Sequence, residues 1–300
     1  MNDLLKVKEV TKIYKEKQTN QLFSALKEVS FTIYDQEMVG IIGESGCGKS
    51  TLLRLIVGLE ELNSGKILYR NKNIAHWLKE ERLAFRQQVQ IIFQNPYEIF
   101  DERKTISQIL LQPLRIHKIG DLSKERELMI RTVMERSGFE HPENYLDRHP
   151  RELSGGQLQR ISILRSLVLN PRLVVADEPV SMLDAAIRSE VLDMFYQANQ
   201  ERGTTIVIVS HDIVPLIRMT HRLIVMKSGQ IVEIIPSDRI YDTSVHPYTK
   251  LLLANANGEE VDSDKMDMLN REFLDWMSKF SGSNMVEVGP GHFVFRQALL

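Results

Sequence analysis

One stretch decides the predicted fold: Gly43-Glu44-Ser45-Gly46-Cys47-Gly48-Lys49-Ser50-Thr51. The apolar run at residues 38–42 before it suits a buried parallel strand, and residues 51–56 after it suit a helix. Glycines let successive backbone N–H groups curl around a phosphate, and the helix start adds further unpaired donors. Lys49 can add a positive charge at the β- and γ-phosphates, and the Ser50 hydroxyl can coordinate Mg²⁺. The stretch therefore predicts a nucleotide-binding phosphate loop, against the alternative of a chance glycine turn.

The chain of 300 residues has an ordinary globular composition and a formal net charge of −2. Proteins that bind nucleic acids usually have a basic excess or a basic face, so this charge gives no reason to expect such a partner. Apolar runs such as residues 206–209 are far shorter than the ~18 residues of a membrane-spanning helix. Residues 1–6 lack the apolar core of a signal peptide, and we therefore expect a protein that stays in the cytoplasm.

Cys47 is the only cysteine, so the chain cannot form an internal disulfide. A thiol beside the start of a helix can have a lowered pKa and act as a nucleophile. We favour the alternative that Cys47 fills a variable position of a loop whose backbone binds the phosphates.

Polar side chains follow two more predicted strands. Residues 89–93 are mostly apolar, suit a buried strand and lead to Gln94; residues 172–176 are similar and lead to Asp177 and Glu178. The C-terminal ends of parallel strands face the ligand crevice of an open α/β sheet. Gln94 can reach Mg²⁺ or an attacking water there, Asp177 suits Mg²⁺, and Glu178 can orient or deprotonate the water. The alternative is a polar strand end at which Asp177 caps a turn.

Tyr14 lies just before the polar loop that joins two predicted antiparallel strands, at residues 5–10 and 22–33. An aromatic ring offers a purine a face on which to stack, so Tyr14 is a candidate to hold adenine. Taken alone, such a residue more often packs on its own sheet.

Two further motifs are weak evidence for a nucleotide site when each is taken alone. His211 follows a predicted strand at residues 203–210, where a donor can touch the γ-phosphate, although a lone histidine is more often structural. The segment Leu153-Ser154-Gly155-Gly156-Gln157 precedes a predicted helix at residues 158–169 and offers bare N–H donors to an anion.

The spacing of apolar residues predicts the rest of the fold. A charged helix is expected at residues 75–87, a helical insertion at 105–138, a helix at 185–201 and a hairpin at 223–233. From residue 236 the alternation of strands and helices stops, and a linker at 255–260, a helix near 265–280 and a short extended tail are expected.

The order of these motifs resembles the ATP-binding subunits of ABC transporters, over residues 4–257. The matching motifs are the A-loop aromatic Tyr14, the Walker A loop 43–51, the Q-loop Gln94, the signature 153–157, the Walker B carboxylates Asp177 and Glu178, the D-loop 181–184 and the switch histidine His211. The resemblance implies an α/β fold, with a P-loop NTPase core of the RecA-like type and an antiparallel β subdomain. It also implies an ATPase domain at residues 1–240, with a helical subdomain at 95–165, and a C-terminal extension at 241–300.

Within that family the chain looks most like the importers of oligopeptides, dipeptides and nickel. The stretches that carry this likeness are 43–52, 93–97, 176–181, 246–250 and 286–294. The resemblance implies two permease subunits, a second ATP-binding subunit that is identical or a sister, an extracytoplasmic solute-binding protein acting indirectly, and no nucleic acid. It places the chain at the cytoplasmic face of the cell membrane.

The family's site residues can be carried over to this chain, with ATP and Mg²⁺ as the ligands. Tyr14 would stack on adenine, and the amides of residues 43–51, with Lys49, would hold the phosphates. Ser50, Gln94 and Asp177 would arrange Mg²⁺, Glu178 would be the general base, and His211 would sense the γ-phosphate. Across a closed dimer, the signature residues Ser154, Gly155, Gly156 and Gln157 would clamp the ATP of the partner chain.

The sequence departs from the family at three places. Met182 stands where the D-loop usually has a small residue, which would alter packing across a dimer. Residues 100–103 differ from the usual pattern near the surface expected to meet the permease. The extension has no cysteine, so the iron–sulfur cluster of several relatives cannot form.

The sequence also leaves other functions open. A soluble ABC-type ATPase that acts on DNA or the ribosome is an alternative, although the chain has one set of motifs and a compact insertion. An export subunit is another, which the importer-type tail disfavours. The solute itself is open among peptides, nickel or metal chelates, and oligosaccharides.

Overall fold

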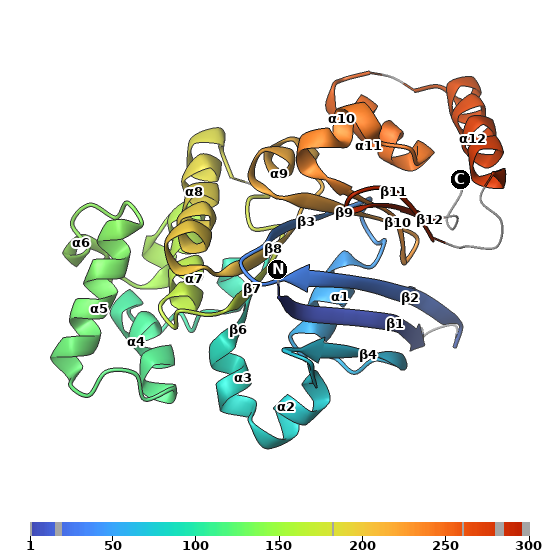
Figure 1. Ribbon diagram of the computed structural model, residues 1–300. Coiled ribbons are helices and arrows are strands. Elements are labelled where there is room, and N and C mark those ends of the chain that lie inside the picture. Colours follow the sequence, from blue (N-terminus) through green and yellow to red (C-terminus); the bar gives the residue numbers. More distant parts are fainter. Residues whose placement is uncertain (1, 16–19, 182, 260, 280–284, 296–300) are drawn as a thin grey trace. The chain divides into compact units, whose positions relative to one another are not determined.

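The structure is a computed structural model that describes residues 2–15, 20–181, 183–259, 261–279 and 285–295 (Figure 1). The chain forms two compact units: residues 1–75 together with 207–300, and residues 76–206. None of the helices in these described ranges is both long enough and apolar enough to cross a membrane.

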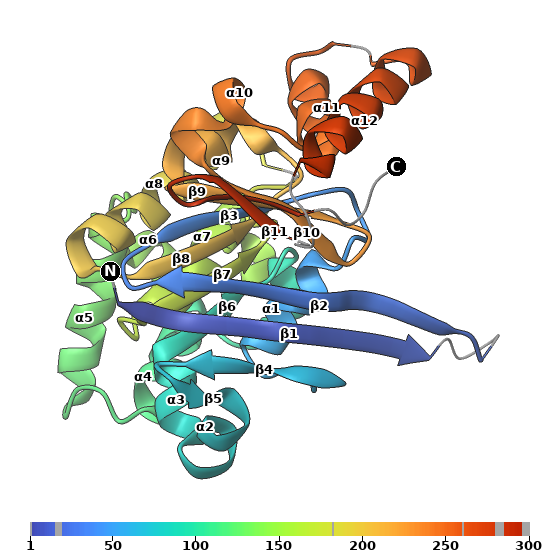
Figure 2. The same cartoon turned by 45° about the vertical axis from the view of Figure 1, so that its right-hand side comes forward.

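The first unit contains an N-terminal antiparallel sheet. β1 (Asp3–Lys15) lies between β2 (Leu22–Tyr34) and β4 (Ser64–Tyr69), and the short β5 (Lys72–Asn73) pairs with β4. Figure 2 shows β1 and β2 as long arrows that run side by side, with the shorter β4 next to β1. The predicted antiparallel pair is confirmed, and each strand is longer than predicted. Most of the predicted loop between them, residues 16–19, lies outside the described residues.

A second sheet holds the strand before the phosphate loop. β3 (Met38–Ile42) is completely buried and runs parallel to β9 (Arg222–Lys227), which confirms the predicted parallel strand. β9 forms the predicted hairpin with β10 (Gln230–Pro236). On the other side of β3 lies β8 (Thr205–Val209).

The extended tail is more ordered than the sequence predicts. β11 (Met285–Gly289) and β12 (His292–Phe295) form a hairpin, and β12 pairs with β10, so the tail extends the sheet in the order β11-β12-β10-β9-β3. The hairpin packs on α12 (Ser263–Ser278) through a small apolar core of Phe273, Met277, Val286 and Val294. The C-terminal extension therefore has a core of its own and is attached to the sheet by backbone hydrogen bonds.

Further helices complete the first unit. They are α1 (Lys49–Ile56), α9 (Ile213–Met219), α10 (Ile240–Thr243) and α11 (Pro247–Ala256), with the 3-10 turn η3 (Ser237–Arg239) before α10. Of these, α1 lies where the sequence predicts a helix, directly after the phosphate loop.

The second unit pairs two parallel strands with a set of helices. Its strands are β6 (Val89–Ile92) and β7 (Leu173–Asp177), which are parallel as predicted. Its helices are α3 (Arg82–Gln88), α4 (Ile106–Ile116), α5 (Ser123–Arg136), α6 (Glu143–Leu146), α7 (Gly155–Leu167) and α8 (Ala185–Arg202), with 3-10 turns η1 (Pro96–Glu98) and η2 (Pro150–Glu152). α4 and α5 confirm the predicted helical insertion.

The single helix predicted at residues 75–87 is wrong. The structure has α2 (Ile74–Glu80) and α3, separated at Glu81, whose backbone is not helical (φ −134°, ψ 39°). The break brings the ring of Trp77 to 6.3 Å from that of Phe85, which is buried. In a straight helix these residues would be about 12 Å apart along the axis, at 1.5 Å per residue, so aromatic packing opposes the continuous helix.

Candidate functional site

The loop after β3 has the curled backbone that its glycines predict. Gly43, Gly46 and Gly48 have φ angles of +152°, +82° and +104°. A Cβ at Gly43 would lie 2.1 Å from the carbonyl oxygen of Met226, and one at Gly48 would lie 2.3 Å from that of Ala25. At Gly46 no atom lies within 4 Å, so only the backbone angle favours glycine there. The loop therefore follows a path against neighbouring backbone that only glycine permits.

Lys49 places its ammonium group inside this loop. Its side chain is buried, and Nζ donates hydrogen bonds to the carbonyl oxygens of Gly43 at 2.7 Å and Glu44 at 2.8 Å. Lys49 also begins α1, whose N-cap is Gly48 and whose first turn has no acidic residue. The helix start therefore presents positive charge without a carboxylate in its first turn, which suits an anion such as a phosphate.

The Cys47 thiol does not have the properties of a nucleophile. It is buried, and burial raises its pKa above the usual value, although the charge of Lys49 opposes the shift. The interpretation of Cys47 as a filler of the phosphate loop fits this environment better than the thiolate alternative.

Tyr14 lies beside the start of α1. Its hydroxyl donates a hydrogen bond to the Glu60 carboxylate, and the Lys12 ammonium lies 4.9 Å from the centroid of its ring. Burial raises the pKa of Tyr14, the bond to Glu60 raises it further, and a hydrogen bond with Thr51 lowers it. The bond to Thr51 brings this side chain close to the phosphate loop, as an aromatic residue that holds adenine requires.

The end of β8 carries His211 to the edge of the sheet at which β3 also ends. The Ser210 N–H donates to the carbonyl oxygen of Ile41 at 3.2 Å, so β8 and β3 end together. His211 follows directly and is exposed, and Asp212 is fixed by a hydrogen bond from its N–H to the Ser210 hydroxyl at 3.0 Å. His211 therefore occupies the strand-end position that the sequence predicts.

The predicted carboxylates and Gln94 meet in the second unit. Ile92 of β6 lies opposite Ala176 of β7, so both parallel strands end at one edge. There the Gln94 amide donates a hydrogen bond to the Glu178 carboxylate at 2.9 Å. Asp177 ends β7 and is 9% exposed, while Glu178 has a φ of +46°, a left-handed conformation that is costly for a non-glycine residue.

The signature segment caps α7. The Ser154 hydroxyl accepts a hydrogen bond from the Gln157 N–H at 3.3 Å, and the Gln157 side chain accepts one from the Ser154 N–H at 3.0 Å. This reciprocal cap starts the helix at Gly155 instead of the predicted residue 158. Ser154 and Gly155 are exposed, whereas a Cβ at Gly156 would lie 2.7 Å from Ile187.

The predicted site residues fall in both units. Tyr14, residues 43–51 and His211 belong to the first unit, and Gln94, Ser154, Gly155, Gly156, Gln157, Asp177 and Glu178 belong to the second. Within each unit, the structure brings the predicted residues of the strand ends to one edge.

Of two departures from the family pattern, Met182 and residues 100–103, the structure describes only the second. Met182, in the D-loop, lies outside the described residues. In residues 100–103, Phe100 is buried and Asp101 accepts hydrogen bonds from Arg103, which lower the pKa of the Asp101 carboxyl. This segment is therefore a compact turn before Thr105, which caps α4.

One contact at the phosphate loop is not predicted from the sequence. The hydroxyl of Tyr248 accepts a hydrogen bond from the Glu44 N–H at 2.8 Å. Tyr248 appears in the sequence only as part of a stretch typical of the importer branch, and no local pattern indicates that it contacts a loop 204 positions away.

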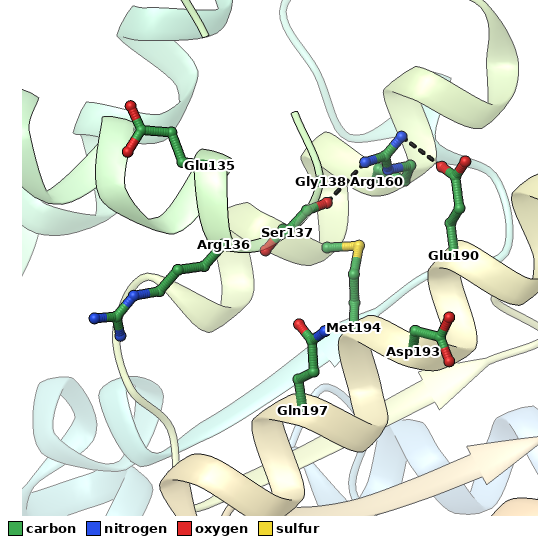
Figure 3. A pocket seen from close by; sticks show the side chains of 9 residues that line it. All are labelled: Glu135, Arg136, Ser137, Gly138, Arg160, Glu190, Asp193, Met194 and Gln197. Carbon is green, nitrogen blue, oxygen red and sulfur yellow. Dashed lines mark hydrogen bonds and ion pairs between the residues drawn. The ribbon is translucent and has the colours of Figure 1, made fainter. Parts of the chain in front are cut away.

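A cavity of about 330 Å³ in the second unit is separate from all these residues (Figure 3). It is lined by Glu135, Arg136, Ser137, Gly138, Arg160, Glu190, Asp193, Met194 and Gln197. The buried Arg160 donates to the carbonyl oxygen of Ser137 at 2.7 Å and pairs with Glu190 at 2.6 Å, as Figure 3 shows. These contacts join the end of α5 to α8, which is a structural role.

Comparison with known proteins gives a consistent set of relatives. Residues 26–181 match a family model described as "ABC transporter". The chain is 36% identical over 274 residues to the oligopeptide transport ATP-binding protein OppF of Bacillus subtilis (strain 168), covering 90% of this chain and 89% of that protein. It is 33% identical to OppF of Streptococcus mutans serotype c, covering 97% of this chain and 94% of that protein.

Solved structures resemble the chain as well. The dimeric structure of a post-hydrolysis state of the ATP-binding cassette MJ0796, bound to ADP and Pi, matches with a TM-score of 0.70 and 30% identity, covering 78% of this chain and 99% of that one. The structure of cbiO1 from Clostridium perfringens, described as part of the ABC transporter complex cbiONQ, matches with a TM-score of 0.68 and 27% identity, covering 80% of this chain and 91% of that one.

Proposed function

Because this chain belongs to the ABC transporter family, we propose that it is the ATP-hydrolysing subunit of an importer that takes up peptides. The likeness to the two OppF proteins extends over 90% and 97% of the chain, and at 97% coverage the match to the Streptococcus mutans protein includes most of the C-terminal extension. That extent favours peptides over nickel or metal chelates and oligosaccharides. It also disfavours a soluble ATPase that acts on DNA or the ribosome.

The observation that carries the ATPase proposal is the phosphate loop itself. Its backbone turns through three glycines with positive φ angles, and the buried Lys49 ammonium lies inside it at the start of α1. This arrangement fits a chain of phosphates, because bare N–H groups, a helix start and a cation converge on one place. Tyr14, beside Thr51, would stack on the adenine of the same ATP.

The residues at the ends of β6 and β7 would carry out hydrolysis. Glu178 would take a proton from water while the water oxygen attacks the γ-phosphorus and the bond to ADP breaks. Gln94 holds the Glu178 carboxylate and would orient it toward that water. His211, exposed at its strand end, would donate a hydrogen bond to the γ-phosphate.

Mg²⁺ fits the donors that this chain offers. The hydroxyl of Ser50, the side-chain amide of Gln94 and the carboxylate of Asp177 all supply oxygen, the ligand type that Mg²⁺ prefers. A bound Mg²⁺ would neutralise charge on the β- and γ-phosphates.

The proposed assembly has two ATP-binding subunits, either two copies of this chain or this chain with a sister, and two permease subunits in the membrane. Ser154, Gly155, Gly156 and Gln157 would clamp the γ-phosphate of the ATP held by the partner chain. The chain would lie on the cytoplasmic face of the membrane, with residues 1–240 as the ATPase domain, 95–165 as the helical subdomain facing the permeases, and 241–300 as the extension.

The test is a purification of the Glu178→Gln variant from the membranes of its own cells, in mild detergent with ATP present. We expect two multi-spanning membrane proteins to copurify, and the Lys49→Ala variant to recover them in smaller amounts because it binds less ATP. Copurification of ribosomes or DNA without a membrane subunit would contradict the transport proposal.

A further inference from the structure

The C-terminal extension reaches the phosphate loop through one side chain. Tyr248, in the first turn of α11, is 3% exposed, and its hydroxyl accepts the N–H of Glu44 at 2.8 Å. Glu44 belongs to the same peptide group as the carbonyl of Gly43, and that carbonyl accepts the Lys49 ammonium at 2.7 Å. The peptide group between Gly43 and Glu44 is therefore held at both ends, by Tyr248 on one side and by Lys49 on the other.

This arrangement couples Tyr248 to Lys49. A peptide group is planar, so its N–H and C=O turn together. If the N–H of Glu44 lost its acceptor, the peptide could rotate, and the Gly43 carbonyl would no longer be fixed where it meets Lys49. The position of Tyr248 therefore sets the conformation of the phosphate loop around Lys49, the residue that gives the loop its positive charge.

A buried network holds Tyr248 in turn. The side chain of His246 caps α11 by accepting the Tyr248 N–H at 3.1 Å. The backbone N–H groups of Val245 and His246 donate to the carboxylate of Glu233, at 2.8 and 3.3 Å. Glu233 is completely buried in β10, and a carboxylate in such a place requires partners.

The tail hairpin supplies one of those partners. His292 of β12 lies with its Nε2 2.8 Å from the Glu233 carboxylate, and it is buried. Phe273 of α12 packs its ring edge-on against His246, with the centroids 4.8 Å apart. The segment before Tyr248 is thus fixed by both the helix and the hairpin of the extension.

Lys227 supports the ring of Tyr248 from another side. Its ammonium lies 5.2 Å from the ring centroid, it is 6% exposed, and it has no hydrogen-bond acceptor among the described residues. Burial lowers the pKa of Lys227, and the charge of Glu44 raises it. Lys227 lies two residues before Gly229, whose N–H donates to the carbonyl oxygen of Cys47 at 3.0 Å. The Lys227 ammonium and the Tyr248 ring therefore pack together next to the phosphate loop.

We propose that the C-terminal extension positions the phosphate loop through Tyr248, and thereby sets the affinity of the chain for ATP. This inference rests on the proposed function, in which the loop binds ATP. Tyr248 is a positioning residue, because it acts on the nucleotide through the peptide group of Glu44. Phe273, Glu233 and His292 determine where Tyr248 lies.

The direct test replaces Tyr248 by phenylalanine, which removes the acceptor and keeps the ring. In the nucleotide-free protein, we expect hydrogen exchange in a peptide that covers residues 43–48 to become about tenfold faster, because one hydrogen bond is lost. The dissociation constant for ATP should rise about five- to tenfold, and KM for ATP should rise with kcat little changed. The matched control is Tyr241→Phe on α10, whose side chain is exposed and should change neither quantity.

These measurements separate the inference from the proposed function. Unchanged exchange in the Tyr248→Phe variant would overturn the inference, whether or not ATP binds. Faster exchange in a protein whose wild type fails to bind ATP would sustain the positioning role and overturn the ATPase proposal. Faster exchange with an unaltered dissociation constant would overturn the claim that Tyr248 sets affinity.

A double-mutant cycle tests the link to the extension. His292→Leu removes a partner of Glu233, and we expect it to raise the dissociation constant for ATP about two- to threefold in the wild-type background. In the Tyr248→Phe background the same change should have no effect. Equal effects in both backgrounds would show that the extension acts by another route and would contradict the proposal.

Discussion

Gln94 donates a hydrogen bond to Glu178 across 2.9 Å, and this contact joins the ends of β6 and β7. Glu178 is held in a left-handed backbone conformation with φ +46°, which a glutamate adopts only when its surroundings impose it. The amide of Gln94 and the strained backbone together fix the direction of one carboxylate. A fixed carboxylate at a strand end suits a general base better than a solvated side chain does.

Replacing Gln94 by alanine should slow hydrolysis more than it weakens binding. The Glu178 carboxylate loses a hydrogen-bond donor and its orientation, so we expect kcat to fall about tenfold while the dissociation constant for ATP changes less than about threefold. Steady-state ATPase assays and equilibrium titration measure the two quantities. Gln197→Ala, an exposed glutamine on α8, is the control. A tenfold loss of affinity with kcat unchanged would contradict an orienting role for Gln94.

Replacing Lys49 by alanine should remove most of the affinity for ATP. The buried ammonium would make charge-assisted bonds to the phosphates, so we expect the dissociation constant to rise about 100-fold, which corresponds to ~2.7 kcal/mol. Fluorescence titration with a labelled ATP analogue measures it. Lys79→Ala is the control, because that side chain is 81% exposed and should leave binding unaltered. Equal affinities in the two variants would remove Lys49 from the phosphate site.

Replacing two loop glycines by alanine should lower the free energy of unfolding by unequal amounts. Gly46 has open space around its Cα, so Gly46→Ala bears only the strain of a positive φ, about 1 kcal/mol. Gly48→Ala bears that strain and also places a Cβ 2.3 Å from the carbonyl oxygen of Ala25, which must move. We expect a loss of at least ~3 kcal/mol in the free energy of unfolding for Gly48→Ala. Urea denaturation measures both, and equal losses would contradict the loop geometry.

Tyr248 should make the stability of the protein depend on pH in the alkaline range. Burial raises its pKa from 10.0 to about 12, so the folded chain keeps the phenol proton where the unfolded chain has lost it. Its contribution is fully present below pH ~10 and is lost as the pH rises from ~10 to ~12, at up to ~1.4 kcal/mol per pH unit. Denaturation of wild type and Tyr248→Phe across this range isolates the effect. Parallel curves for the two proteins would contradict the burial of the hydroxyl.

The sequence predicts the parts of the fold that local chemistry determines. The glycines, Lys49 and the flanking apolar run leave little choice but strand, loop and helix, and β3 and α1 lie where expected. The strand ends that carry Gln94, Asp177 and Glu178 follow from mostly apolar runs that stop at polar residues. At these places the local pattern and the tertiary structure require the same conformation.

Features that depend on distant partners are not predicted. No local signal interrupts the helix at Glu81, because the break comes from the packing of Trp77 on Phe85. The tail becomes a hairpin only through pairing of β12 with β10. The helix start at Gly155 is a different case, because its capping box of Ser154 and Gln157 is local and is a recognisable sequence pattern. The contact between Tyr248 and Glu44 joins segments far apart in the chain, and a single sequence does not reveal such a pair.

ATP turnover by the Glu178→Gln variant, measured beside its ATP binding, tests whether Glu178 is the general base. Glutamine keeps the size of the side chain but cannot accept a proton, so we expect hydrolysis to fall at least about 100-fold with ATP still bound and the dimer long-lived in gel filtration. Glu80→Gln, an exposed glutamate at the end of α2, should leave turnover unaltered. Hydrolysis by Glu178→Gln at the wild-type rate would contradict this role, because the chain would then hydrolyse ATP without the base that its strand ends provide.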